Sequence, residues 1–259
     1  PLYSSAASDV YKRQVVDFGL RRIHGADAGL KGARAFYVAG LAGTSHVLAG
    51  RVYGLPVTGT MAHAYVQAHE DDASAFRAFT ALYPDTILLV DTYDTLEGVR
   101  TVVRLSRELG DAFRVRGIRL DSGDLAHLAR ESRRILDDGG LEEVEIFASG
   151  GLDEQRIAAL LEAGAPVDGF GVGTRMSTSH DAPSLDMAYK LTAYAGAGRT
   201  KLSARKPILP GPKQIFRLEE GGTAVGDRVA LEGESHPGRP LLEVVMEGGR
   251  VLPSARVAL

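Results

Sequence analysis

The chain has 259 residues, of which 44% are apolar and 24% charged, and its formal net charge is −3. This balance is typical of a globular protein with room for one barrel-sized domain and an appendage, and it gives no electrostatic support to a nucleic-acid or anionic-membrane partner. The absence of cysteine excludes disulfides, thiolate metal sites and thiol nucleophiles, and it agrees with a cytoplasmic location. No apolar run approaches the ~20 residues of a membrane-spanning helix.

The first fourteen residues differ in character from the rest of the chain. Residues 1–8 show no periodicity, and Asp9–Gln14 has the sequence expected from translating an adapter used in DNA sequencing libraries. We therefore predict that residues 1–14 are a non-native or disordered leader, that the fold begins at Val15, and that an upstream region is missing. A disordered native tail is the alternative, and different codons for residues 9–14 in the source DNA would favour it.

The first predicted strand, residues 15–18, turns at Gly19 into the paired arginines Arg21 and Arg22. Two guanidinium groups at a strand end suit bidentate binding of a carboxylate or phosphate, although a solvated basic turn is an equally good interpretation. Residues 25–40 then have the apolar periodicity of a helix. A loop at residues 43–46 follows, ahead of a short apolar run.

His63 follows Gly59 and Thr60 at a point where a short strand is predicted to become a helix. This position suits a proton carrier or a phosphoryl acceptor, although a lone histidine is more often structural. The helix is predicted to continue through Tyr83 with His69 in its middle. The separation of the two histidines is poor spacing for a shared metal ion, and we assign no function to His69.

A βα repeat is the main pattern of the following hundred residues. Apolar strands are predicted at 86–89, 117–120, 144–147 and 169–172, about 25–30 residues apart, with an amphipathic helix in each gap. This alternation predicts a parallel α/β protein. Because the carboxyl ends of parallel strands meet at one edge of a sheet, we expect the polar residues after these strands to build one site.

Carboxylates follow two of these strands. Asp91 and Asp94 follow the first, and Asp121 and Asp124 follow the second, with the Ser122 hydroxyl between them. Asp94 and Asp124 each precede a predicted helix, where a capping role is the simpler explanation. Asp121 lies within the strand end itself and is therefore the stronger candidate for chemistry.

Glycine-rich turns follow the last two strands. Gly150 and Gly151 come after Ser149 and precede a predicted helix, and Gly173 and Thr174 repeat the arrangement one unit later. Bare backbone amides at the start of a helix form an anion site. One such turn is weak evidence, but neighbouring final strands of a barrel commonly share one phosphate group.

The βα rhythm fades after Tyr189, and short strands joined by proline and glycine turns take its place. We predict strands at residues 201–205, 207–209, 213–217, 229–231 and 242–246. The predicted organisation is an α/β domain at residues 15–199, with its start missing, and a β-rich subdomain at 200–259.

Seven motifs, in order and at suitable spacing, resemble the nicotinate phosphoribosyltransferase family. They are Asp17–Arg22, Gly59–His63, Leu89–Thr95, Arg119–Asp124, Ala148–Gly151, Gly171–Thr174 and Lys206–Gln214. The resemblance runs from about Val15 to Arg217, and this many ordered motifs make it specific. It implies the irregular (β/α) TIM-like barrel of type II phosphoribosyltransferases with an appended C-terminal β-rich subdomain.

The resemblance also implies a reaction. Nicotinate and phosphoribosyl pyrophosphate (PRPP) become nicotinate mononucleotide and pyrophosphate in NAD salvage, with Mg²⁺ and with ATP as a co-substrate whose hydrolysis is coupled through a phosphohistidine. It further implies a cytoplasmic homodimer with shared active sites, and small-molecule substrates only.

The resemblance assigns roles residue by residue. His63 matches the phosphohistidine, Asp121 the aspartate that contacts ribose, and Arg119 an arginine near the pyridine carboxylate and the pyrophosphate. The nicotinate side comprises Arg21, Arg22, Ser45, Thr60 and Arg119. The PRPP side comprises Asp121, Ser122, Gly150, Gly151, Gly173 and Thr174, with Thr178 as an alternative hydroxyl. No residue is assigned as a Mg²⁺ ligand.

Four alternatives stay open. Nicotinamide phosphoribosyltransferase has an aspartate where this chain has Ser45 and lacks the arginine matching Arg22, and both differences favour the nicotinate carboxylate. Quinolinate phosphoribosyltransferase would call for a richer basic cluster. An aldolase-like barrel would need a Schiff-base lysine at a strand end, and none is found there. The chain is also consistent with an inactive, ligand-binding fragment, because the family's N-terminal domain supplies an aromatic residue to the site.

Overall fold

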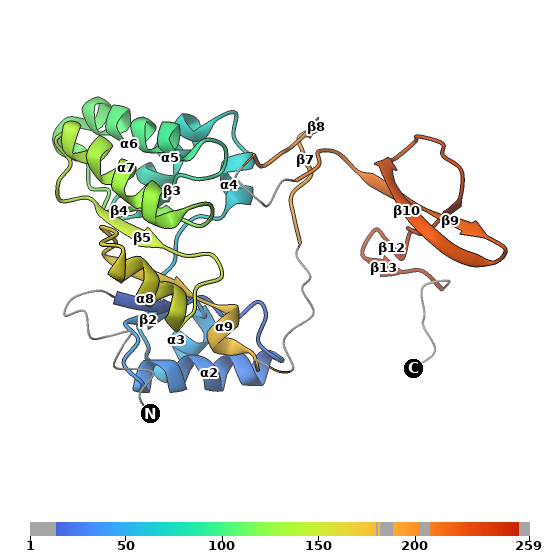
Figure 1. The fold of residues 1–259 in the computed structure, drawn as a ribbon, viewed down its shortest axis with the longest axis horizontal. Coiled ribbons are helices and arrows are strands. Elements are labelled where there is room, and N and C mark those ends of the chain that lie inside the picture. The colour runs from blue at the N-terminus through green and yellow to red at the C-terminus, as the bar shows by residue number, and fades with distance from the viewer. Residues whose placement is uncertain (1–13, 180, 182–188, 203–207, 254–259) are drawn as a thin grey trace. The chain divides into compact units, whose positions relative to one another are not determined.

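A computed structural model describes residues 14–179, 181, 189–202 and 208–253 (Figure 1). Contacts within the chain divide it into two compact units. The first unit extends to Lys190 and also includes Lys201–Ile208. The second comprises Leu191–Thr200 and the chain from Leu209 onward.

The first unit is built on a six-stranded sheet with the order β2-β1-β6-β5-β4-β3. Its strands are β1 (Gln14–Asp17), β2 (Gly43–Thr44), β3 (Ile87–Leu89), β4 (Gly117–Leu120), β5 (Glu145–Ala148) and β6 (Gly169–Val172). Every neighbouring pair is parallel. The predicted parallel α/β arrangement is therefore confirmed, as an open half-barrel with β2 and β3 at its edges.

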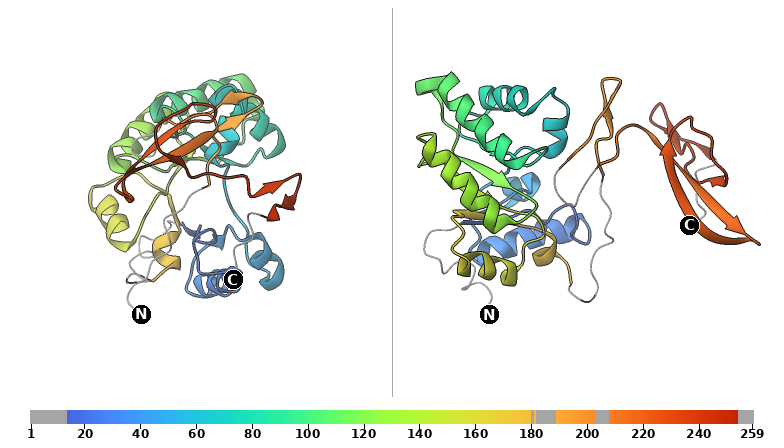
Figure 2. Two further views of the ribbon diagram at one scale, coloured as in Figure 1. Left: turned by 90° about the vertical axis from the view of Figure 1, so that its right-hand side faces the viewer. Right: turned by 45° about the horizontal axis from the view of Figure 1, so that its top comes forward.

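Helices connect the strands (Figures 1 and 2). They are α2 (Ala26–Val38), α3 (Val47–Tyr53), α4 (His63–Gln67), α5 (Asp72–Leu82), α6 (Thr95–Leu109), α7 (Leu125–Asp138), α8 (Glu154–Glu162) and the short α9 (Thr174–Ser177), with a 3₁₀ turn at Gly110–Ala112. Asp94 and Asp124 begin α6 and α7, where their side chains accept the backbone N–H groups of Glu97 and His127. The capping interpretation of both residues is confirmed.

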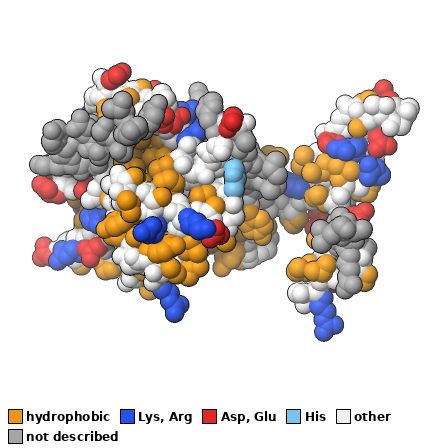
Figure 3. Space-filling view, turned by 90° about the horizontal axis from the view of Figure 1, so that it is seen from below, with side chains coloured by type: hydrophobic (Ala, Val, Ile, Leu, Met, Phe, Trp, Pro, Cys, Tyr) orange, Lys and Arg blue, Asp and Glu red, His pale blue; other side chains and the backbone are white. Residues whose placement is uncertain are grey.

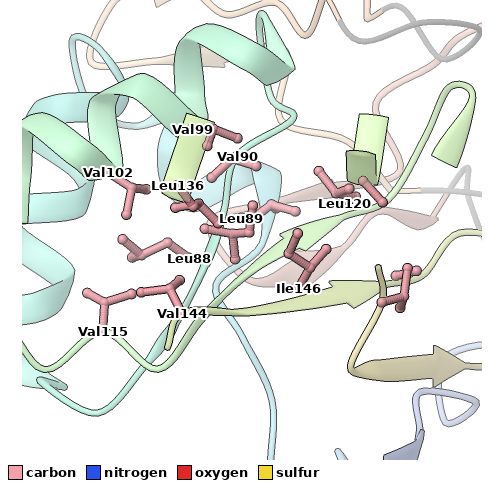
Figure 4. Packing of buried hydrophobic residues seen from close by; sticks show 14 of the residues in the cluster. Leu88, Leu89, Val90, Val99, Val102, Val115, Leu120, Leu136, Val144 and Ile146 are labelled. Carbon is pink, nitrogen blue, oxygen red and sulfur yellow. The ribbon is translucent and has the colours of Figure 1, made fainter. Parts of the chain in front are cut away.

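One hydrophobic core holds the sheet to its helices. Leu88, Leu89, Leu120 and Ile146 of the strands are fully buried, and they pack with residues of α6 and α7 such as Leu136 (Figure 4). The strands read as continuous apolar runs because both faces of a parallel sheet are covered. This rigid core fixes the positions of the polar turns that follow each strand.

The single helix predicted from His63 to Tyr83 is wrong, because the structure divides it into α4 and α5. Asp71 starts the second helix through a capping box: its carboxylate accepts the backbone N–H of Ser74, and the Ser74 hydroxyl accepts the N–H of Asp71. His69 lies between the two helices. The apolar run predicted after the first loop opens helix α3.

The second unit is a set of small antiparallel sheets. Its strands are β7 (Ala193–Tyr194), β8 (Ala197–Gly198), β9 (Lys213–Glu220), β10 (Thr223–Leu231), β11 (Arg239–Pro240), β12 (Met246–Glu247) and β13 (Arg250–Val251). The predicted strands at 213–217 and 229–231 lie within β9 and β10, whereas most of 242–246 is not a strand. Residues 203–207 of the predicted strands at 201–209 lie outside the described residues. Among the described helices, none has the length and apolar character needed to cross a bilayer.

Candidate active site

The carboxyl ends of the parallel strands gather polar residues at one edge of the sheet. β1 ends at Asp17, β4 leads into Asp121, β5 into Ser149 and β6 into Gly173, and Asp91 is the second residue after β3. The strand register sets these ends side by side, as the sequence pattern predicted.

Asp91 organises the turn after β4. Its side chain is fully buried, and its Oδ2 accepts hydrogen bonds from the Asp121 backbone N–H at 3.1 Å and from the Ser122 hydroxyl at 2.7 Å. The Ser122 hydroxyl thus stabilises the turn after β4. Within the part of the chain that the structure describes, the buried Asp91 Oδ1 has no hydrogen-bond partner.

Arg119 and Asp121 form a half-buried ion pair with Ser149. An Arg119 terminal nitrogen donates to Asp121 Oδ1 at 3.1 Å and to the Ser149 hydroxyl oxygen at 2.9 Å, and the Ser149 hydroxyl donates to the same Asp121 oxygen at 2.8 Å. The other terminal nitrogen donates to the Met61 carbonyl oxygen at 3.2 Å. Arg119 and Ser149 thus both bind the same oxygen of Asp121, Oδ1.

His63 begins α4 and faces both carboxylates. Its Nε2 lies 3.7 Å from Asp121 Oδ2 and 4.0 Å from Asp91 Oδ1, and its Nδ1 lies 3.1 Å from the Thr92 hydroxyl. When the proton is on Nδ1, the imidazole donates to Thr92 and presents the Nε2 lone pair to the site. Nε2 is buried and has no hydrogen-bond partner among the described residues.

Burial changes the charge balance of this cluster. Desolvation lowers the pKa of His63 below its ordinary value, against the raising effect of Asp121 and Asp91, and Lys201 lowers it further. Burial also lowers the pKa of the Arg119 guanidinium, an effect that Asp121 and Asp91 oppose and that the charge of Arg21 reinforces. At neutral pH the site therefore contains a neutral imidazole beside a buried arginine and two carboxylates.

A small pocket lies inside the half-barrel beside Arg119. It is lined by Val16, Phe18, Thr58, Gly59, Thr60, Ile87, Arg119, Phe147, Phe170 and Gly171. The Arg119 guanidinium lies 5.8 Å from the centre of the Phe18 ring. The pocket combines aromatic surface with one cation.

The glycine turn after β5 lies directly against Asp121. Gly150 has φ +97°, and a Cβ at this position would lie 1.8 Å from the Asp121 carbonyl oxygen, so only glycine fits. Helix α8 is capped by Asp153, which accepts the Arg156 N–H, and the Arg156 side chain donates to the Gly151 carbonyl. The close approach brings the Gly150 and Gly151 backbone to the same strand ends as Asp121.

The β1 turn carries the paired arginines. Asp17 fixes it by accepting the Gly19 N–H and the Thr44 hydroxyl, each at 2.7 Å. Arg21 is exposed and Arg22 half-buried in this turn, and the Ser45 N–H donates to the Asp17 carbonyl oxygen at 2.9 Å. The turn and the start of α3 therefore lie together at the β1–β2 edge.

The predicted hydroxyl groups after β6 belong to α9. Gly173 precedes this helix and packs against the Phe18 carbonyl, where a Cβ would approach to 2.9 Å. Thr174 is the first residue of α9, and the Thr178 hydroxyl donates to the Thr174 carbonyl oxygen at 2.8 Å. The hydroxyl proton of Thr178 is thus already donated within the end of α9.

Sequence reasoning missed three residues of this cluster. Phe18 lies within the Asp17–Arg22 motif and Thr92 within the Leu89–Thr95 motif, yet the sequence predicted no role for either residue. Lys201 comes from a segment distant in sequence, and its side chain is 1% exposed. No periodicity signal marks such a residue, because its neighbours in space come from other elements.

No cluster of three or more acidic, histidine or cysteine side chains that could hold a metal ion occurs among the described residues. Mg²⁺ usually keeps several waters and is bound by one or two carboxylates together with substrate phosphates. The residues of this site fit an ion that enters with a phosphorylated substrate.

Residues 13–213 match the Nicotinate phosphoribosyltransferase (NAPRTase) family. This chain belongs to that family. A nicotinate phosphoribosyltransferase of Mycobacterium tuberculosis is 59% identical over 238 residues, which cover 92% of this chain and 51% of the relative. The Bacillus subtilis nicotinate phosphoribosyltransferase is 41% identical over 228 residues, covering 85% of this chain and 46% of the relative. The chain spans about half the length of the curated relatives it matches.

Solved nicotinate phosphoribosyltransferases have related folds. The human nicotinic acid phosphoribosyltransferase aligns with a TM-score of 0.55 and 28% identity, over 90% of this chain and 55% of that one. The Porphyromonas gingivalis nicotinate phosphoribosyltransferase aligns with a TM-score of 0.65 and 22% identity, over 79% of this chain and 58% of that one. The second likeness concerns the fold alone.

Proposed function

We propose that the protein transfers a phosphoribosyl group from PRPP to nicotinate in NAD salvage, giving nicotinate mononucleotide and pyrophosphate. The observation that carries the proposal is the meeting of His63, Arg119 and Asp121 at the carboxyl ends of the sheet. Membership of the nicotinate phosphoribosyltransferase family supports the same conclusion.

Asp121 stabilises the transfer step. The bond between the ribose anomeric carbon and the pyrophosphate oxygen breaks as the pyridine nitrogen bonds to that carbon, and positive charge develops on the ribose in between. A carboxylate held at a fixed position against this charge lowers the barrier. Arg119 holds the Asp121 carboxylate in place, and the Gly150 and Gly151 amides, with the turn at Gly173 and Thr174, bind the 5-phosphate.

His63 couples the reaction to ATP. Neutral Nε2 attacks the γ-phosphorus of ATP, the bond to the bridging oxygen breaks and ADP leaves, while Nδ1 keeps its proton toward Thr92. Water later hydrolyses the phosphohistidine to histidine and phosphate. Burial keeps the imidazole neutral at physiological pH, which is the form that can attack. Mg²⁺ carried by the pyrophosphate of PRPP would neutralise part of the charge of that group.

Nicotinate binds in the pocket beside Arg119. The Phe18 ring offers a surface for the pyridine ring, Thr60 lines the same pocket, and Arg119, Arg21 and Arg22 supply the positive charge that a carboxylate requires. Ser45 replaces the aspartate that would repel this carboxylate and favour a carboxamide. Nicotinamide is the second candidate substrate.

For the whole protein we expect a closed TIM-like barrel, a homodimer in which the partner contributes to each site, and a cytoplasmic location. The family's longer relatives support this expectation, since the chain spans about half of their length.

The test is mononucleotide formation by the protein expressed from its complete gene. Nicotinate and nicotinamide are offered separately with PRPP, with and without ATP. We expect turnover of nicotinate alone, stimulated by ATP, with the stimulation lost in His63→Ala and kept in the matched control His69→Ala. Preference for nicotinamide would overturn the substrate assignment, and no turnover of either would favour an inactive ligand-binding barrel.

A further inference from the structure

Ser149 is a buried residue of the site to which the proposed mechanism gives no role. It is the first residue after β5, and it is 2% exposed. Leu120 pairs with Ala148 in the sheet, so that Asp121 and Ser149 follow paired residues of β4 and β5. The Ser149 N–H donates to the Leu120 carbonyl oxygen at 2.8 Å. The backbone of Ser149 is therefore fixed beside Asp121.

The Ser149 hydroxyl has a defined hydrogen-bond direction. Its oxygen lies 2.9 Å from Arg119 Nη1 and 2.8 Å from Asp121 Oδ1. A guanidinium group has only donors, so the serine oxygen accepts from Arg119 and its proton is available for another acceptor. The Leu120 carbonyl oxygen is farther away, at 3.3 Å, and a carboxylate is the stronger acceptor. Ser149 therefore donates to Asp121.

These contacts fix the orientation of the Asp121 carboxylate. The terminal torsion of an aspartate has broad minima, so its rotamer alone does not decide which oxygen faces which neighbour. Oδ1 accepts from Ser149 at 2.8 Å and from Arg119 at 3.1 Å, and Oδ2 lies 3.7 Å from His63 Nε2. Rotation of the carboxylate away from this orientation would break both hydrogen bonds to Oδ1.

Ser149 is the stiffer of the two anchors. Its side chain is short and its backbone is bound to Leu120 of β4, whereas Arg119 reaches Asp121 through a long side chain and also donates to the Met61 carbonyl oxygen. Loss of the serine hydroxyl would leave Oδ1 with the longer and more flexible contact.

We propose that Ser149 is a positioning residue for the phosphoribosyl transfer, because its hydroxyl holds the Asp121 carboxylate with Oδ1 toward Arg119 and Oδ2 toward His63. The inference deepens the proposed function, since it rests on the role of Asp121 in the transfer. A carboxylate that is already oriented needs no reorganisation when positive charge develops on the ribose.

Kinetics of nicotinate mononucleotide formation test the proposal on the protein from its complete gene. We expect Ser149→Ala to lower kcat by about tenfold, the loss of a hydrogen bond to a charged group, with little change in the KM values for PRPP and nicotinate. Ser149→Thr keeps the hydroxyl and is expected to retain most of the wild-type kcat. An equal loss of kcat in both variants would contradict the role of the hydroxyl.

A double-mutant cycle separates positioning from a general structural effect. In an Asp121→Asn background, the residual kcat is measured with radiolabelled nicotinate. Ser149→Ala is expected to cause no comparable further loss there, because its effect acts through the Asp121 carboxylate. The same fold-loss in both backgrounds would overturn the proposal.

Ser132→Ala is the matched control. Ser132 of α7 is fully buried, and its hydroxyl has no hydrogen-bond partner among the residues that the structure describes. The substitution removes the same group from the interior of the same unit, and it is expected to leave kcat unchanged.

Crystal structures of the wild type and Ser149→Ala test the orientation without turnover. We expect the Asp121 carboxylate in one orientation in the wild type, and rotated or in two orientations in Ser149→Ala. If the wild-type protein turns over no nicotinate, the proposed function fails, and the two structures then decide the role of Ser149. An unrotated Asp121 carboxylate in Ser149→Ala, or a wild-type kcat in that variant, would overturn the inference.

Discussion

Gly171 shapes the pocket through the side chain it lacks. A Cβ at this position in β6 would lie 2.4 Å from the Phe18 ring. The ring occupies the space and lies 5.8 Å from the Arg119 guanidinium. Gly169 and Gly171 of this strand therefore leave space for the Phe147 and Phe18 rings.

Gly171→Ala is expected to displace Phe18 and weaken substrate binding. Overpacking of this kind costs ~1–3 kcal/mol of stability, and we expect the KM for nicotinate to rise by about tenfold. Steady-state kinetics and thermal denaturation measure the two effects. Gly226→Ala in β10 is the control, because a Cβ there meets nothing within 4 Å. An unchanged KM in Gly171→Ala would contradict the role given to the Phe18 ring.

The residues of the site differ in how far the sequence could predict them. The structure brings His63, Arg119 and Asp121 together. The βα repeat predicted Arg119 and Asp121 at the carboxyl end of β4, whereas His63 begins helix α4 and follows no strand of the sheet directly. Their chemical roles stay predictions. Phe18 and Lys201 escaped notice because their importance depends on packing against elements distant in sequence.

At the scale of elements, the N-terminus of α6 shows a carboxylate with a purely structural contact. Asp94 is exposed and accepts the Glu97 N–H at 2.8 Å. It lies three residues after Asp91, which is fully buried and holds the Asp121 turn. Asp94 thus caps a helix, whereas Asp91 holds the turn at Asp121.

Asp94→Ala is expected to lower the free energy of unfolding by ~1 kcal/mol, the usual value of a lost helix cap, and to leave kcat unchanged. Asp121→Asn is expected to do the reverse, with a large loss of kcat and a small change in stability. Urea denaturation and steady-state kinetics on both variants provide the comparison. A loss of activity in Asp94→Ala equal to that in Asp121→Asn would show that the structural assignment is wrong.

Asp72, the first residue of α5, lies where burial and neighbouring carboxylates destabilise its charged form. Burial raises its pKa to about 6, and the nearby carboxylates of Asp71, Asp91, Asp94 and Glu97 add to the effect. The folded state therefore binds a proton that the unfolded chain releases near pH 4. Stability contributed by this group is complete below that pH and is lost as the pH rises to about 6.

Asp72→Asn is expected to remove this pH dependence. Relative to wild type, the variant gains ~1 kcal/mol of unfolding free energy between pH 4 and pH 7, after allowance for solvent screening. Chemical denaturation at both pH values measures the change. A difference between the two proteins that stays constant with pH would contradict the raised pKa.

The elements themselves were largely predictable. The strands of the half-barrel are mostly apolar, with Arg119 of β4 as an exception, and their burial on both faces leaves little ambiguity. The break between α4 and α5 was missed because neither glycine nor proline marks it. Its signal was the capping pair Asp71 and Ser74, which a search for breaker residues passes over.

At the scale of the whole molecule, the first unit carries an apolar surface over α2 and α3. Figure 3 shows hydrophobic side chains gathered on the face seen from below. Val38 is 75% exposed and Val47 70%. Tyr37, Leu48, Val52 and Tyr53 of the same helices are also exposed. A patch of this kind marks an interaction surface or a tendency to aggregate.

Residues 15–259 are therefore expected to aggregate when expressed alone. Light scattering coupled to size-exclusion chromatography measures the outcome, with Val38→Lys and Val47→Lys together as the variant expected to reduce association. A monodisperse monomer of the unmodified fragment would contradict the expectation. The parallel direction of the strands followed from the βα repeat of the sequence.

The route of the chain between the units has a genetic consequence. The chain leaves the first unit after Lys190, returns for Lys201–Ile208 and leaves again. A stop codon at residue 191 would thus delete Lys201 along with the β-rich unit. Exchange of that unit between relatives requires three crossovers, one after Lys190 and one on each side of the returning segment, and a single crossover after Lys190 would transplant the lysine into the recipient as well.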